Sequence, residues 1–165
     1  SDLKEFSLLG RAKYEKIHTV PLRFLPKEIG SHANLETLRI TNSFISELPK
    51  EIGNLNNLRL LNLEDNKLTE IPKEIGNLRN LEHLYLSGNN LTELPKEIGN
   101  LTNLKTLCIA GNNLIEIPKE IGNLNCLKNL CIETNEQKLE RIPNEIKNLD
   151  LEEGLDMSYK WYLGK

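Results

Sequence analysis

Aromatic residues, basic clusters and long apolar runs are all scarce in this chain of 165 residues. Aromatic side chains make up only 5% of the sequence, which predicts a core built from aliphatic residues. No stretch approaches the roughly 20 apolar residues of a membrane span, and the first residues contain no apolar leader. The net charge of −3, with Lys and Glu interleaved, lacks the basic patch of a nucleic-acid-binding protein. We therefore expect neither a membrane span nor a nucleic-acid partner.

The chain is also poor in cysteine and in catalytic motifs. Its three cysteines, Cys108, Cys126 and Cys131, are an odd number, unlike the disulfide framework of a small secreted scaffold. Free thiols and the lack of a leader favour the cytoplasm, with secretion or surface display as the alternative. Metalloprotease, hydrolase, dinucleotide-binding and phosphate-loop motifs are all missing. The sequence predicts no enzyme, no metal site and no cofactor.

What the sequence does contain is a repeat. Five of six regularly spaced prolines are followed by Lys-Glu-Ile-Gly, and the spacings are 23, 23, 23, 23 and 25 residues. Between the prolines, Leu or Ile recurs at motif positions 1, 4, 6 and 11, with Asn at position 9. One unit shows the whole pattern in Leu58, Leu61, Leu63, Asn66 and Leu68.

These residues resemble the leucine-rich repeat family, whose pattern is L-x-x-L-x-L-x-x-N-x-L. The L-P-x-x-I-G-x-L continuation is similar to the 23-residue class of bacterial repeat proteins and Ras-suppressor-like scaffolds. The resemblance implies an α/β repeat solenoid, a horseshoe with a parallel sheet on the concave side. Short helical or 3-10 turns would form the convex side.

The repeats predict a single leucine-rich-repeat domain over residues 1–165. Residues 1–24 are interpreted as a degenerate N-terminal cap, 25–141 as five full repeats, and 142–165 as a C-terminal half repeat and cap. Such caps keep the ends of a solenoid soluble.

The caps are aligned by counting single periods outward from the full repeats. Counting back places Ile17 at position 6 and the polar Glu15 at position 4, where a leucine belongs. Counting forward places Leu155 and Met157 at positions 4 and 6. The aromatic segment 161–163 is expected to fold over the last coil, or else to face a missing domain or second subunit.

The Asn column is predicted to be structural. Its amides lie where the chain turns out of the strand, and they can bond the backbone groups that the turn leaves unpaired. The first unit has Ser43 at this position. The predicted ladder consists of Asn66, Asn89, Asn112 and Asn135.

The outward strand positions 3, 5 and 7 vary, whereas the inward positions do not. Selection for a particular partner produces such variation, and so does drift on a tolerant surface. We predict a partner-binding surface on the concave face, centred on Tyr85 and His83, because Tyr and Arg are common interface anchors. The candidate residues are Arg39, Asn62, Glu64, His83, Tyr85, Cys108, Asn129, Cys131, Glu133 and Asp156.

Cys108 and Cys131 are 23 residues apart and so occupy position 5 on adjacent strands. Their Cα atoms should lie about 4.8 Å apart, within disulfide range. Because parallel strands tend to hold the Cβ atoms too far apart, we interpret them as two exposed thiols, with a disulfide or a metal site as alternatives. His83 is about 8 Å away by the strand spacing, too far for a Cys–His nucleophile.

The sequence therefore predicts a non-catalytic, monomeric module that binds a partner protein. Two alternatives stay open. The chain could be the recognition domain of a longer effector or signalling enzyme, or an adhesive repeat protein of a cell surface.

Overall fold

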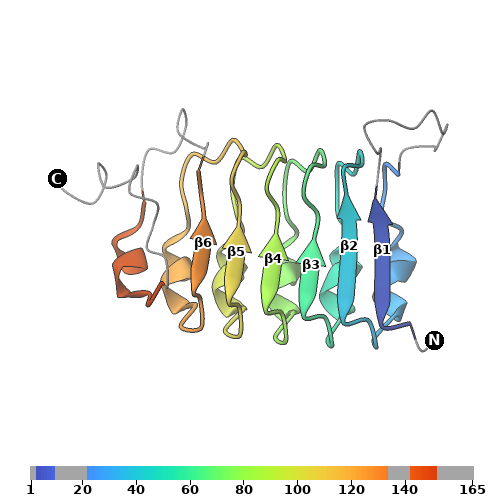
Figure 1. The fold of residues 1–165 in the computed structure, drawn as a ribbon, viewed down its shortest axis with the longest axis horizontal. Coiled ribbons are helices and arrows are strands. Elements are labelled where there is room, and N and C mark those ends of the chain that lie inside the picture. Colours follow the sequence, from blue (N-terminus) through green and yellow to red (C-terminus); the bar gives the residue numbers. More distant parts are fainter. Residues whose placement is uncertain (1–2, 10–21, 134–141, 152–165) are drawn as a thin grey trace.

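A computed structural model describes residues 3–9, 22–133 and 142–151. Among these residues, parallel strands in chain order form one six-stranded sheet (Figure 1). Each strand is hydrogen-bonded only to its neighbours in the sequence of repeats, as expected of a solenoid. The strands are β1 (Glu5–Leu9), β2 (Thr37–Thr41), β3 (Leu60–Asn62), β4 (His83–Tyr85), β5 (Thr106–Cys108) and β6 (Asn129–Cys131).

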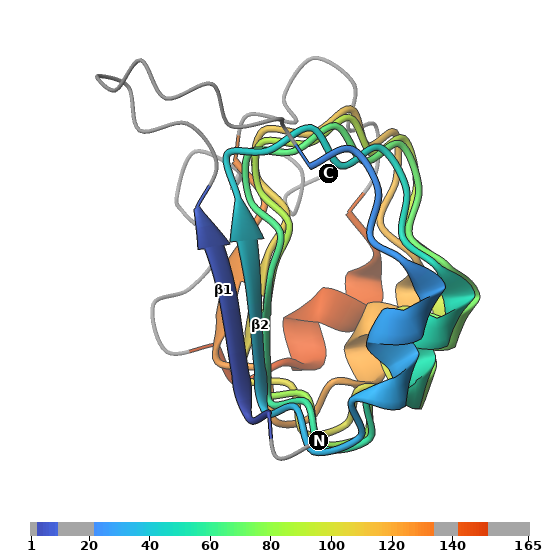
Figure 2. The same cartoon turned by 90° about the vertical axis from the view of Figure 1, so that its right-hand side faces the viewer.

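Short 3-10 helices cover the side of the solenoid opposite the sheet (Figure 2). Each follows one of the regularly spaced prolines, whose fixed φ angle near −65° suits the start of a helical turn. The helices are η1 (Lys27–Ser31), η2 (Lys50–Asn54), η3 (Lys73–Asn77), η4 (Lys96–Asn100), η5 (Lys119–Asn123) and η6 (Asn144–Asn148).

The hydrogen bonds of η3 explain why these segments are 3-10 rather than α-helical. Ile75 N donates to the carbonyl of Pro72 at 3.0 Å, and Leu78 N donates to the carbonyl of Ile75 at 3.1 Å. Both bonds span three residues, the 3-10 spacing, and a segment of five residues gives little room for the next α-helical bond. The turn closes quickly and returns the chain to the next strand.

The core lies between the sheet and the 3-10 helices. The side chains at positions 1, 4, 6 and 11 of the second unit, namely Leu58, Leu61, Leu63 and Leu68, are fully buried. Leu61 pairs in register with Leu84, which pairs with Leu107. A single coil cannot enclose these leucines, so each depends on the coils on either side for its burial.

After each of β2 to β5, the chain turns out of the strand at position 8 through a left-handed backbone. Four successive units use Asn42, Asp65, Gly88 and Gly111, with φ between 52° and 69°. Asn, Asp and Gly are the residues that adopt this conformation most readily. The reversal leaves nearby backbone groups without strand partners.

The Asn side chains at position 9 bond those groups. Asn89 Oδ1 accepts a hydrogen bond from Leu68 N at 3.0 Å, while its Nδ2 donates to the carbonyls of Leu63 at 3.0 Å and Leu86 at 2.9 Å. Asn66 and Asn112 repeat this arrangement on their own coils. Each amide therefore links its own coil to the preceding one. Asn135 lies outside the described residues.

The N-terminal alignment made by counting back one period was wrong. Phe6, rather than Glu15, pairs with Leu38 at position 4, and Leu8, rather than Ile17, pairs with Ile40 at position 6. The separation between β1 and β2 is 37 − 5 = 32 residues instead of 23. Counting back assumes a constant connection length, whereas strand pairing requires only that an alternating apolar strand meets the sheet edge.

The predicted fold class is confirmed by the parallel sheet and the opposing 3-10 turns. Within the described part of the chain, no helix has the length and apolar character needed to cross a membrane. Leu155, Met157 and the aromatic segment 161–163 of the predicted C-terminal cap lie outside the described residues.

Candidate functional site

The outward surface of β2 to β6, together with the position-7 residues that follow the strands, is called the sheet face here. Leucines between the outward residues point into the core, so alternation along each strand brings positions 3 and 5 to the same surface. Seven candidates lie on these strands and are half-buried: Arg39, Asn62, His83, Tyr85, Cys108, Asn129 and Cys131. Glu64 is half-buried and Glu133 exposed just beyond them. Asp156 lies outside the described residues.

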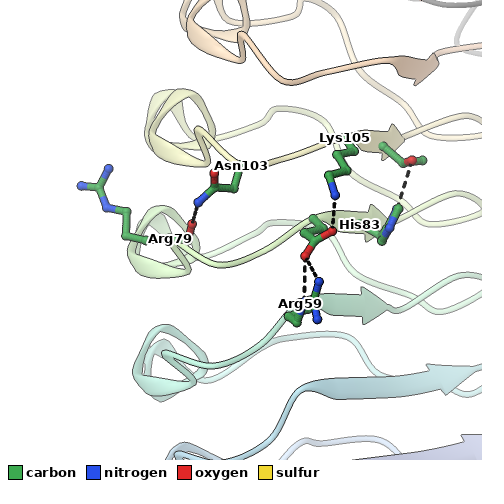
Figure 3. Close-up of polar contacts among 7 residues, drawn as sticks. Arg59, Arg79, His83, Asn103 and Lys105 are labelled. Carbon is green, nitrogen blue, oxygen red and sulfur yellow. Dashed lines mark hydrogen bonds and ion pairs between the residues drawn. The ribbon is translucent and has the colours of Figure 1, made fainter.

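Two aromatic rings on β4 lie at the centre of the sheet face. The rings of His83 and Tyr85 are stacked, with centroids 6.3 Å apart and planes inclined by 11°. His83 Nδ1 also lies 3.1 Å from Thr106 Oγ1 on β5 (Figure 3). Stacking and this polar contact hold both rings in one arrangement, which lowers the entropy that binding would cost.

Burial and neighbouring groups disfavour further negative charge around Tyr85. Burial is the main reason that the pKa of Tyr85 is raised, with Cys108 and Glu64 adding to the effect. The pKa of Cys108 is raised well above its usual range, again mainly by burial. Its hydrogen bond to Cys131 and the nearby Glu64 and Glu133 raise it further. The middle of the sheet face is thus partly desolvated and has an acidic margin.

The other polar candidates are held by local bonds. Asn62 Nδ2 donates to Glu64 Oε2 at 3.0 Å, and Asn62 Oδ1 accepts from Glu64 N at 3.0 Å. Arg39 Nη1 donates to Glu5 Oε1 on β1 at 2.9 Å. The candidates therefore form one continuous surface but do not converge on a single point.

Sequence analysis missed a row of charged residues at position 2, beside the sheet face. The Glu82 carboxylate accepts a hydrogen bond from Arg59 Nε at 2.7 Å and another from Lys105 Nζ at 2.6 Å. These two donors lie on the coils on either side of Glu82 (Figure 3). Two further pairs continue the row: Lys4 with Glu36 at 3.2 Å, and Lys128 with Asp150 at 2.8 Å. The alternating signs of Glu36, Arg59, Glu82 and Lys105 at position 2 were the available signal. The parallel register brings Glu82 against the two cations that flank it.

Replacing Glu82 by glutamine is expected to remove a pH-dependent part of the stability. Hydrogen bonds from Lys105 and Arg59 lower the pKa of Glu82 from 4.5 to about 2 in the folded chain. The carboxylate therefore stabilises the fold above pH 4.5, and this contribution is lost as the pH falls towards 2. We expect Glu82→Gln to cost about 1 kcal/mol at pH 7, since the ion pairs are partly exposed.

Thermal melting between pH 2 and 7 measures this effect. The difference between the wild type and Glu82→Gln should shrink as the solution is acidified below pH 4.5. Glu93→Gln, at an exposed carboxyl outside the row, is the matched control. A difference that stays constant with pH would contradict the ion-pair assignment.

A second Asn row also escaped sequence analysis. Asn57, Asn80 and Asn103 each donate from Nδ2 to a carbonyl of the preceding coil, at 2.9, 2.7 and 2.8 Å. Figure 3 shows the bond from Asn103 to Arg79. The equivalent residue of the next coil is the exposed Cys126, which breaks the row. The repeated Asn before position 1 was the available signal.

The surface has one depression beside the sheet face and another on the opposite, 3-10 side. One of about 320 Å³ is lined by Asn80, Asn103, Cys126 and the Arg59–Glu82–Lys105 group. A groove of about 700 Å³ runs on the 3-10 side, where Ile117, Pro118, Ile142 and Pro143 contribute its apolar surface. Within the described residues, no three His, Cys, Asp or Glu side chains are grouped so that they could hold a metal ion.

The sequence matches a family model described as a leucine-rich repeat region, over residues 1–85 and 50–159. The two matches together cover most of the chain. The chain belongs to the leucine-rich repeat family. The solved structures that resemble this leucine-rich repeat chain support the same fold, whereas no curated protein is significantly similar to it in sequence.

Three solved structures illustrate the resemblance. A leucine-rich repeat protein of Leptospira interrogans is 39% identical, with a TM-score of 0.57, over 78% of this chain and 39% of that one. The functional domain of InlJ from Listeria monocytogenes, which includes a cysteine ladder, is 25% identical, with a TM-score of 0.65, over 78% and 26%. The plant peptide hormone receptor RGFR1, in complex with RGF2, is 34% identical, with a TM-score of 0.61, over 78% and 25%. This leucine-rich repeat chain thus spans well under half the length of each of these proteins.

Proposed function

We propose that this leucine-rich repeat chain is a non-catalytic recognition module that binds a partner protein on the sheet face. The observation that carries the proposal is the contrast between two sets of residues on the same strands. Leucine or isoleucine occupies every inward position of β3 to β6, whereas most outward positions differ from repeat to repeat, Cys108 and Cys131 being an identical pair. A framework with interchangeable outward residues is suited to specific recognition without a catalytic centre.

The centre of the sheet face has the properties of an interface anchor. His83 and Tyr85 are half-buried and stacked, so their rings bring apolar area to an interface at little cost in conformational freedom. Glu64 and Glu133 beyond the strand ends favour a partner that presents basic side chains to that margin. The structure of RGFR1 with RGF2 is consistent with a peptide or protein partner.

Replacing Tyr85 by alanine is expected to weaken partner binding by about 2 kcal/mol, roughly 30-fold in affinity, as for an anchor residue. Affinity capture with the wild type as bait identifies candidate partners, and calorimetry then measures each variant. Ile115→Ala is the matched control, because it removes a large apolar side chain that is 51% exposed and lies away from the sheet face.

The scan continues with alanine at Arg39, Asn62 and His83, each checked for folding by thermal melting. Undiminished affinity in all four variants would exclude the sheet face and direct attention to the groove around Ile117 and Ile142. A module within a longer effector or signalling enzyme would bind through the same surface. An adhesive surface protein is the other alternative, and the sequence of the full-length gene product distinguishes these cases.

A further inference from the structure

Cys108 and Cys131 are brought together by the register of the repeats. They are Cα partners at the ends of β5 and β6, and both are half-buried and not joined in a disulfide. The neighbouring Cys131 side chain is one of the groups that raise the pKa of Cys108, after burial. The third thiol, Cys126, is exposed before β6 and serves below as an internal control.

The geometry of parallel strands favours a bridging atom over a direct disulfide. Side chains on neighbouring strands point the same way and start about 4.8 Å apart, whereas a disulfide needs Cβ atoms about 3.8 Å apart. A thiophilic atom between the two sulfurs makes two bonds of about 2.3 Å, the length of a zinc–thiolate bond. At a pyramidal trivalent centre, two such bonds hold the sulfurs about 3.5 Å apart, well beyond the S–S bond of about 2.0 Å in a disulfide.

The groups around the two thiols favour a bridged product that carries no negative charge. Cys108 is half-buried, and Glu64 and Glu133 oppose a further negative charge there. A monovalent soft cation would leave two thiolates with a net negative charge, which these carboxylates disfavour. A trivalent centre that already has one organic substituent takes two sulfurs and leaves no charge. The site therefore suits an arsenical better than a copper(I) ion.

We propose that Cys108 and Cys131 form a two-thiol site on the sheet face that captures trivalent organic arsenicals by bridging arsenic between their sulfur atoms. In water the reagent is an arsenic dihydroxide with one organic group. Two As–S bonds form and two As–O bonds break, while the two thiol protons leave with the hydroxyl groups as two water molecules. Arsenic stays trivalent throughout. The organic group would lie on the sheet face near Tyr85, the register partner of Cys108.

The test uses the reduced protein, phenylarsine oxide as the probe and an excess of a monothiol as competitor. Native mass spectrometry should count one phenylarsenic group per wild-type chain. Cys108→Ser and Cys131→Ser should each weaken capture by roughly 100-fold or more, because the second As–S bond is no longer intramolecular. Cys126→Ser should bind as the wild type does.

Cys108→Ala and Cys131→Ala repeat the test with a second side chain, and circular dichroism confirms that each variant is folded. Absence of an adduct on the wild type would overturn the proposal. So would loss of the adduct in Cys126→Ser, or its full retention in a folded Cys108 or Cys131 variant. The probe is a small molecule, so the outcome is independent of whether the sheet face binds a protein partner.

Discussion

Replacing Gly99 by alanine is expected to destabilise the solenoid by about 3 kcal/mol, the upper part of the range for overpacking. Gly99 is a buried residue of η4. A Cβ atom added there would lie 2.5 Å from the carbonyl oxygen and 2.8 Å from the Cβ of Glu120, one coil further on. The obstacle includes backbone, so relief requires neighbouring coils to separate.

Thermal and denaturant unfolding measure this cost. Lys96→Ala, at an exposed residue of the same helix, is the control and should leave the midpoint nearly unchanged. If Gly99→Ala and the wild type have the same unfolding midpoint, the glycines of the repeat do not set the spacing between the 3-10 helices. Gly53 and Gly76 make equally close approaches to Glu74 and Glu97, so alanine at either should reproduce the effect.

Replacing Asn89 by alanine is expected to lower the free energy of unfolding by about 1–3 kcal/mol. The side chain is 5% exposed and joins two coils. Its loss leaves Leu68 N and the carbonyls of Leu63 and Leu86 without these bonds. Alanine has no polar group to replace them, and water reaches the site poorly.

The control for this variant is Asn90→Ala, which removes an exposed amide from the next residue. We expect its unfolding midpoint to match that of the wild type. Equal unfolding curves for Asn89→Ala and Asn90→Ala would show that the buried amide contributes nothing to the joining of coils. Asn112→Ala provides a second, independent measurement, because its amide makes the equivalent bonds.

Much of the fold could be predicted because the same residue pattern recurs in several successive units. Pro72 and Gly76 mark a short turn, and Leu61 and Leu63 mark an inward-facing strand. The structure confirms the sheet and the 3-10 turns. The prediction failed at β1, where a connection of different length separates Phe6 from its partner Leu38. Period counting gives no information once the period changes.

The candidate site was less predictable. Position numbers assigned Tyr85 and Cys108 to outward strand positions, and their role in binding stays a prediction. The stacking of His83 on Tyr85 depends on side-chain rotamers, which a sequence pattern does not specify. The ion pairs of Glu82 depend on its distance in space from Arg59 and Lys105, each of which is 23 residues away in the sequence. That distance exists only after the coils stack.

The sequence by itself determined the unit of this protein: an inward leucine strand, an Asn at the turn, and a proline-led helical turn. Periodicity and local backbone preference act within a few residues, so one coil can be inferred from its own letters. The tertiary structure alone decided which polar side chains bond across coils, including Arg59 with Glu82 and His83 with Thr106. Such contacts arise because strand register places residues far apart in the chain within about 5 Å of one another.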